Sequence, residues 1–121
     1  MFNLFRPKSA QQDVSPAQAQ ALIAQGAPVV DVREPSEFAA GAIKGSINVP
    51  LGAIQQRGGA ALADATIDLQ APHIVLVCRS GNRSGQACAA LRGVLGERGH
   101  NLAGGVMAWG NQGLPLSPGG A

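Results

Sequence analysis

The residue types best suited to covalent chemistry lie in one short segment, Cys78-Arg79-Ser80-Gly81-Asn82-Arg83-Ser84. A glycine-containing loop between a strand and a helix can turn several backbone N–H groups toward one point and so bind an anion. Cys78 lies at the rim of this predicted nest. The N–H donors, the helix dipole and the charges of Arg79 and Arg83 favour the thiolate, so we expect a pKa for Cys78 below the ~8.5 of free cysteine. The segment therefore predicts a nucleophilic cysteine with an anion-binding loop beside it.

Three further polar residues are weaker candidates. Asp31 and Arg33 end the strand expected beside this loop. They either orient the loop by hydrogen bonds or form a structural pair that fixes the strand ends, and both interpretations stay open. Cys88 lies on the following helix, where it could resolve an oxidised Cys78. Its place on the apolar stripe with Leu91 favours buried packing instead.

The composition argues against several other classes of site. Cys78, Cys88, His73 and His100 lack the short spacings of zinc ligands, so we predict neither a metal site nor a cofactor. A net charge of +2 with scattered basic residues, three Phe, one Trp and no Tyr does not favour nucleic-acid binding. No apolar run approaches the ~20 residues of a membrane span. The apolar start, residues 1–5, is too short for a signal peptide, so we expect a cytoplasmic protein.

The elements that must position the loop alternate between helix and strand. In 121 residues with 45% hydrophobic side chains we expect one folded domain, residues 13–117, between a mobile leader, residues 1–12, and a tail, residues 118–121. Helices are predicted from Ser15 to Gly26, within residues 51–69, and from the reactive loop to near Gly99. Strands are predicted over residues 28–33, 46–49 and 73–78, with a short edge strand at Asn101-Leu102 and a last helical turn at residues 106–109.

This alternation is typical of a parallel sheet joined by right-handed crossovers, with helices on both faces. The strand over residues 73–78 is apolar on both faces, as expected at the centre of such a sheet. Functional sites of these sheets lie beyond the carboxyl ends of the strands. Cys78 lies at such an end.

Four motifs in order resemble the single-domain rhodanese family, and the match spans about residues 14–116. They are Asp31-Val32-Arg33-Glu34-Pro35 with Glu37-Phe38; Gly41-Ala42-Ile43-Lys44-Gly45-Ser46-Ile47-Asn48-Val49-Pro50-Leu51; Cys78 to Ser84; and Leu102-Ala103-Gly104-Gly105 with Ala108-Trp109 and Gly113-Leu114-Pro115. The resemblance implies a five-stranded, mostly parallel sheet. It also implies a sulfurtransferase whose loop cysteine, here Cys78, carries a persulfide.

Two departures from the family pattern fall outside the reactive loop. Ala42 stands where the family often has His, and Gly99-His100-Asn101 replaces a more apolar strand. The partners that the resemblance implies are a small anionic sulfur donor such as thiosulfate and a cyanide or thiol acceptor. A protein sulfur acceptor is a further candidate.

The length of the loop distinguishes sulfur transfer from other activities of the same fold. Phosphatases and arsenate reductases resemble a Cys-x5-Arg pattern, whereas four residues separate Cys78 from Arg83. The shorter loop forms a smaller bowl, which favours a terminal sulfur over a phosphate ester. A non-catalytic or redox-sensing binding module is the main alternative, because a fold does not fix a function. Such a module is expected to lack the cysteine.

Overall fold

Five strands form one sheet within residues 13–120, the part of the chain that the computed structural model describes. They are β1 (Asp13–Val14), β2 (Val29–Asp31), β3 (Ile47–Asn48), β4 (Ile74–Val77) and β5 (Gly99–Leu102), in the spatial order β1-β5-β4-β2-β3. Every pair of neighbours is parallel. The predicted α/β class with a five-stranded sheet is confirmed. The predicted leader, residues 1–12, lies outside the described residues.

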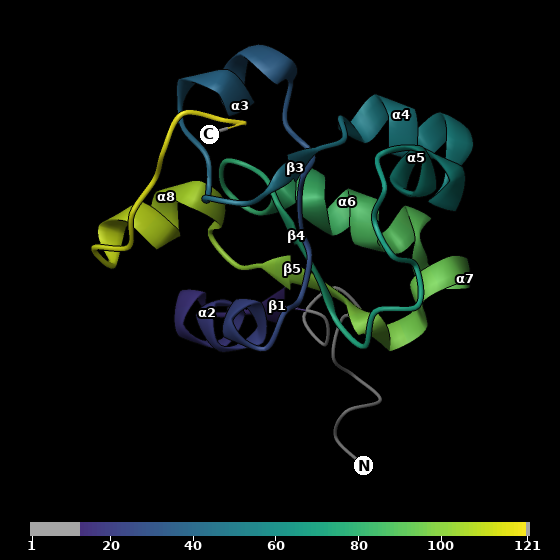
Figure 1. The fold of residues 1–121 in the computed structure, drawn as a ribbon, viewed down its shortest axis with the longest axis horizontal. Helices are drawn as coiled ribbons and strands as arrows, with labels where there is room; N and C mark the ends of the chain where they lie inside the picture. Colours follow the sequence, from purple (N-terminus) through teal and green to yellow (C-terminus); the bar gives the residue numbers. More distant parts are fainter. Residues whose placement is uncertain (1–12, 121) are drawn as a thin grey trace.

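Helices cover both faces of the sheet (Figure 1). They are α2 (Pro16–Ala24), α3 (Pro35–Ala40), α4 (Leu51–Arg57), α5 (Gly59–Asp64), α6 (Asn82–Ala90), α7 (Arg92–Leu95) and α8 (Gly105–Asn111), with a 3-10 turn, η2 (Gly96–Arg98), before β5. Figure 1 shows α2 and α8 on one side of the sheet and α4 to α7 on the other. The two layers enclose two separate hydrophobic clusters.

Strand β4 supplies side chains to both clusters because successive residues of a strand point to opposite faces. Ile74 and Leu76 pack with α4 to α7, whereas Val75 and Val77 pack with α2 and α8. All four side chains are fully buried. This accounts for the continuous apolar run that precedes Cys78 and fixes the strand from which the reactive loop leaves the sheet.

Helix α2 begins and ends where the sequence predicts. The hydroxyl oxygen of Ser15 accepts from the N–H of Gln18 at 3.1 Å, and the Gln18 side chain accepts from the N–H of Ser15 at 2.9 Å. These reciprocal bonds form a capping box, with Pro16 at the first helical position. Gly26, at φ +100°, ends the turn that follows the helix.

The last strand is longer than predicted and lies inside the sheet. Strand β5 spans Gly99–Leu102 and pairs with both β4 and β1, so the predicted edge position of Asn101-Leu102 is wrong. The edge belongs to β1, a two-residue strand that the sequence pattern did not reveal. The helix before β5 is interrupted at Leu91 and divides into α6 and α7.

The C-terminal segment returns to α3. Ala42 and Ser117 form an antiparallel bridge, with nitrogen-to-oxygen distances of 2.6 and 2.8 Å in its two hydrogen bonds. Beyond it the N–H of Gly119 donates to the carbonyl of Ala39 at 3.3 Å. Figure 1 shows this segment passing alongside α3. The described part of the predicted tail is therefore bonded to the domain.

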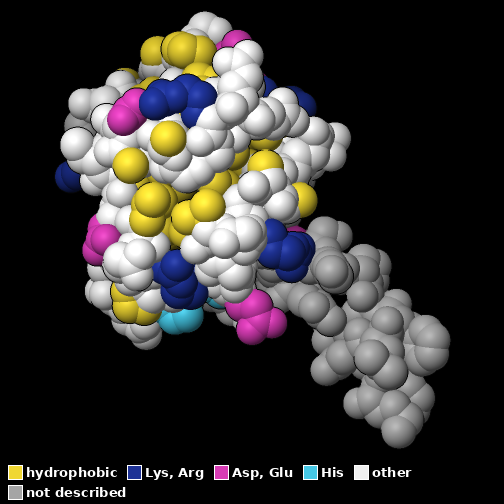
Figure 2. All heavy atoms as spheres, turned by 90° about the vertical axis from the view of Figure 1, so that its right-hand side faces the viewer, with side chains coloured by type: hydrophobic (Ala, Val, Ile, Leu, Met, Phe, Trp, Pro, Cys, Tyr) yellow, Lys and Arg dark blue, Asp and Glu magenta, His cyan; other side chains and the backbone are white. Residues whose placement is uncertain are grey.

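The side of the molecule that carries α4, α5 and α7 has a mixed surface. Figure 2 shows hydrophobic side chains near its centre, with separate Lys and Arg side chains and acidic side chains around them. The basic side chains visible on this side do not form the continuous stripe that follows a nucleic-acid backbone.

Candidate active site

Cys78 is the first residue after β4, at the carboxyl edge of the sheet. The next three residues form a tight loop that ends at Gly81, whose φ of +103° places it in the left-handed region. Helix α6 then begins at Asn82. A short loop between a buried strand and a helix directs the helix N-terminus toward the end of that strand. The cysteine and the N–H groups therefore meet as the sequence predicts.

Hydrogen-bond donors surround the sulfur of Cys78. The N–H of Gly81 donates to Sγ at 3.0 Å, and the hydroxyl of Ser84 lies 3.4 Å from Sγ. Burial is the largest influence on the pKa of Cys78 and acts to raise it. The Ser84 hydroxyl and the N–H groups of Ser84, Gly81 and Ser80 together outweigh burial, so the pKa of Cys78 lies below its ordinary value.

The N-terminus of α8 is hydrogen-bonded to the backbone of the loop. The N–H of Val106 donates to the carbonyl of Cys78 at 2.9 Å, and the N–H of Met107 donates to the carbonyl of Arg79 at 3.1 Å. Gly105 allows this approach, because a Cβ there would lie 2.5 Å from the carbonyl oxygen of Cys78. Its φ of +61° also favours glycine. The Gly104-Gly105 motif therefore positions the reactive loop.

The two arginines of the loop lie in different surroundings, and one of them has a carboxylate partner that the sequence did not predict. Arg83 forms a two-pronged ion pair with Glu37 of α3, at 2.7 and 2.9 Å. The Arg83 bonds lower the pKa of Glu37 to about 2. The pKa of Arg83 is raised, first by Glu37 and to a smaller extent by the charge of Cys78. Because Glu37 balances much of this charge, hydrogen bonds rather than arginine charges are the main support of the thiolate. Arg79 is exposed.

Asp31 and Arg33 bind each other at the end of β2. The Arg33 guanidinium donates to Asp31 at 2.7 Å and to the carbonyl of Gly41 at 2.7 Å. Both residues are buried. These contacts favour the interpretation as a structural pair, which anchors the segment after α3 to the sheet. The bonds found for their side chains within residues 13–120 do not reach the Cys78 loop.

The remaining predicted residues lie on the outer side of the loop or in the core. Ser80 and Asn82 are exposed next to the buried Ser84. Cys88 is buried, and burial raises its pKa to about 12. A thiol with that pKa stays protonated near neutral pH, so Cys78 and Cys88 are chemically distinct.

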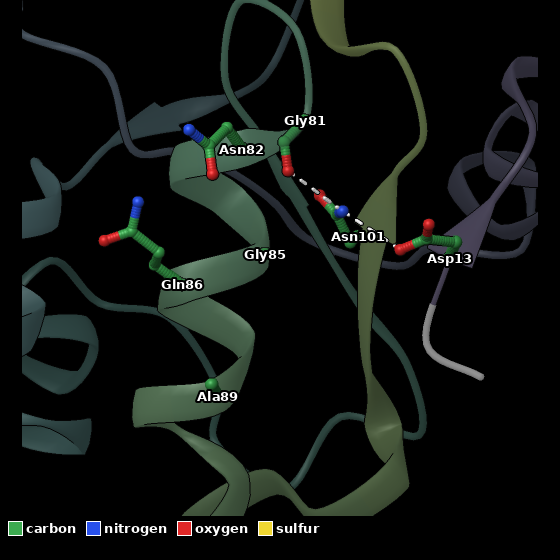
Figure 3. Close-up of a pocket in the computed structure, with 7 residues that line it drawn as sticks. All are labelled: Asp13, Gly81, Asn82, Gly85, Gln86, Ala89 and Asn101. Atoms are coloured by element: carbon green, nitrogen blue, oxygen red, sulfur yellow. Dashed lines mark hydrogen bonds between the residues drawn. The ribbon is translucent and has the colours of Figure 1, made fainter. Parts of the chain in front are cut away.

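Asn101 connects the loop to β1, a role that the sequence analysis missed. Its amide nitrogen donates to the carbonyl of Gly81 at 3.1 Å and to the carboxylate of Asp13 at 3.0 Å (Figure 3). Its side-chain oxygen accepts from the Ser84 hydroxyl. These bonds border a cavity of about 400 Å³, lined by Asp13, Gly81, Asn82, Gly85, Gln86, Ala89 and Asn101. The signal in the sequence that could have indicated this role was Gly99-His100-Asn101, which is more polar than the strand common at this place in the family.

The described residues contain neither a metal-binding cluster nor a membrane-spanning helix. Within residues 13–120 there is no group of three or more His, Cys, Asp or Glu side chains arranged to hold a metal ion. No helix in that range has the length and apolar character needed to cross a membrane.

The motifs that converge on the loop match a known family. The family model for the rhodanese-like domain matches residues 15–112. The chain belongs to the rhodanese-like domain family. It is 39% identical to a sulfurtransferase of Allochromatium vinosum over 88 residues, 73% of this chain and 76% of the relative. It is also 39% identical to the thiosulfate sulfurtransferase GlpE of Pseudomonas entomophila over 98 residues, 79% of this chain and 82% of the relative.

Solved structures of rhodanese-like proteins have the same fold. A rhodanese-related protein of Thermoplasma volcanium superposes with a TM-score of 0.72 at 27% identity, covering 88% of this chain and 97% of that protein. The human single-domain sulfurtransferase TSTD1 gives a TM-score of 0.71 at 29% identity, with 84% and 96% covered. The predicted family and fold are confirmed, and three of these four similar proteins are named sulfurtransferases.

Proposed function

We propose that this rhodanese-like domain transfers a sulfane sulfur from an anionic donor such as thiosulfate, through a persulfide on Cys78, to cyanide or a thiol. The observation that carries the proposal is the surroundings of Sγ, which has the Gly81 N–H at 3.0 Å and the Ser84 hydroxyl at 3.4 Å. These donors suit the negative sulfur that both the thiolate and the persulfide present. The names of the relatives support the same chemistry.

In the first step the Cys78 thiolate attacks the outer sulfur of thiosulfate. An S–S bond forms between Sγ and that sulfur, and the bond to the sulfonyl sulfur breaks. Its electron pair leaves with sulfite. The negative charge now lies on the outer sulfur of the persulfide, where N–H groups of the loop can stabilise it.

In the second step the acceptor attacks the outer sulfur. Cyanide becomes thiocyanate, or a thiolate becomes a persulfide, and the electron pair of the broken S–S bond returns to Sγ. Cys78 is a thiolate again, and no outside oxidant or reductant is consumed. Two half-reactions that share a covalent intermediate give ping-pong kinetics. A thiolate nucleophile needs no general base, which fits a site supplied mainly with hydrogen-bond donors.

Each loop residue has a proposed part in this reaction. The backbone N–H groups from Ser80 to Ser84 hold the anionic sulfur, and Arg79 and Asn82 line the exposed entrance. Arg83 attracts the donor while its ion pair with Glu37 fixes its position. Asp31 and Arg33 support the adjacent strand end. We place the reaction in the cytoplasm, where Cys78 and Cys88, both free thiols, stay reduced.

A transfer assay with paired cysteine variants tests the proposal. Cys78→Ser is expected to abolish sulfur transfer from thiosulfate to cyanide, whereas Cys88→Ser keeps most of it. Circular dichroism checks that both variants are folded. Equal loss in two folded variants would contradict the single-cysteine mechanism and favour a dithiol one. Full activity in Cys78→Ser would contradict the nucleophile itself.

A further inference from the structure

The hydroxyl of Ser84 has two acceptors and one proton. Its oxygen lies 2.5 Å from Oδ1 of Asn101 and 3.4 Å from Sγ of Cys78, which is within hydrogen-bond reach of a sulfur atom. Ser84 is completely buried and Asn101 is 6% exposed. Since a hydroxyl donates only one hydrogen bond at a time, a bond to Asn101 is made at the expense of a bond to Sγ.

The orientation of the Asn101 side chain is fixed by its nitrogen. That nitrogen donates to the carbonyl of Gly81 and to the carboxylate of Asp13, two groups that can only accept (Figure 3). A flipped amide would place its oxygen against both acceptors. Oδ1 therefore has to face Ser84.

We propose that Asn101 is a positioning residue for the nucleophile: its oxygen, held toward Ser84 by Asp13 and Gly81, competes with Sγ for the single hydroxyl proton. The proposal rests on the proposed function, in that Cys78 is taken as the nucleophile. The chain of contacts joins β1, β5, α6 and the end of β4. Asn101 does not touch Sγ, but through these contacts it controls the strength of the hydrogen bond from Ser84 to the thiolate.

The competition has a consequence in both halves of the reaction. With a free thiolate, the charge on Sγ draws the hydroxyl proton toward sulfur. Once a sulfur has been transferred to Cys78, the charge lies on the outer sulfur atom. The Ser84 hydroxyl then donates its hydrogen bond to Asn101 and no longer to Sγ. Ser84 is buried, and an unpaired buried hydroxyl is costly. Sγ and Asn101 between them keep it paired at each stage.

The test is the pKa of Cys78 in a double-mutant cycle of Asn101→Leu and Ser84→Ala. The pKa is measured from the rate of alkylation by iodoacetamide against pH, with Cys88→Ser as the common background. Asn101→Leu also removes the bonds to Gly81 and Asp13, but these losses are present with and without the Ser84 hydroxyl and cancel in the cycle. The charged groups around the loop stay the same in all four proteins; they are Arg79, Arg83 with Glu37 and Glu34, and Asp13.

We expect Asn101→Leu to lower the pKa of Cys78 more when Ser84 is present than in Ser84→Ala. The expected difference is about 0.5 to 1 in pKa, the size of one hydrogen bond to an ion shared between two acceptors. Equal changes in the two backgrounds, or a difference of the opposite sign, would overturn the proposal. This readout does not need sulfur transfer, so failure of the proposed function would leave it interpretable.

A milder pair of variants covers the case in which Asn101→Leu does not fold. Asp13 is exposed. Asp13→Ala removes the acceptor that orients Asn101, whereas Asp13→Asn removes the same charge and keeps an acceptor oxygen. We expect the pKa of Cys78 to be lower in Asp13→Ala than in Asp13→Asn. Identical values in these two variants would contradict the orienting role of Asp13.

Discussion

Gly105→Ala is expected to disturb the reactive loop through a direct collision with its backbone. A Cβ at this position would lie 2.5 Å from the carbonyl oxygen of Cys78 and closer still to the backbone of Arg79. Backbone carbonyls cannot rotate away as a side chain can. The loop or the start of α8 must shift, and the bonds from Val106 and Met107 to the loop carbonyls lengthen.

The magnitude follows from two costs. Placing alanine at a φ of +61° costs about 1–2 kcal/mol. The collision adds the cost of overpacking, about 1–3 kcal/mol. We therefore expect Gly105→Ala to lower the free energy of unfolding by about 2–5 kcal/mol. A loop displaced by about 1 Å also misaligns the N–H donors, and we expect roughly a hundredfold loss of sulfur transfer.

Gly113→Ala is the matched control. Gly113 has a φ of +78°, and nothing lies within 4 Å of its Cβ position, so only the backbone cost of about 1–2 kcal/mol remains. Urea unfolding and thiosulfate-to-cyanide transfer are measured on both variants under conditions where both are folded. If Gly105→Ala has the same stability and activity as Gly113→Ala, the close approach of α8 does not position the loop.

Four further variants test the charges and the loop. Arg83→Ala should raise the KM for thiosulfate with little change in kcat, because the guanidinium holds the donor in ground and transition states alike. Glu37→Gln weakens a partly exposed ion pair and should lower the free energy of unfolding by less than about 1 kcal/mol. An unchanged KM in Arg83→Ala would contradict this. Burial and His73 hold the pKa of His100 below 6.5, so the unfolded chain binds more protons and the free energy of unfolding should fall as the pH drops through that value. His100→Asn should flatten this slope in urea titrations, and an equal slope would rule out His100 as its source. A glycine inserted after Ser80 should depress sulfur transfer and strengthen phosphate binding in calorimetry; unchanged values of both would show that loop length does not select sulfur over phosphate.

Local patterns predicted the parts of the fold that depend on local physics. The capping box at Ser15 involves residues three apart, and the apolar run of β4 reports burial on both faces without reference to any partner. The loop from Cys78 to Ser84 likewise carries its own geometry, because Gly81 supplies the left-handed turn and α6 follows at once.

The contacts that complete the site join distant parts of the chain. Glu37 meets Arg83 across 46 positions, and Asn101 meets Asp13 across 88. The hydrophobic periodicity of the sequence does not predict such pairs, because they depend on which elements become neighbours in the fold. The same holds for β1: a two-residue strand has no pattern of its own and is defined only by pairing with β5. The loop was therefore predictable, whereas the side chains that support it were not.

The intact mass of the protein tests most directly whether Cys78 carries the sulfur. The reduced protein is incubated with thiosulfate, desalted and measured by mass spectrometry before and after addition of a thiol. We expect a gain of one sulfur atom that the thiol removes, present in Cys88→Ser and absent in Cys78→Ser. No mass gain in the wild-type protein, or a gain that persists in folded Cys78→Ser, would contradict the persulfide mechanism.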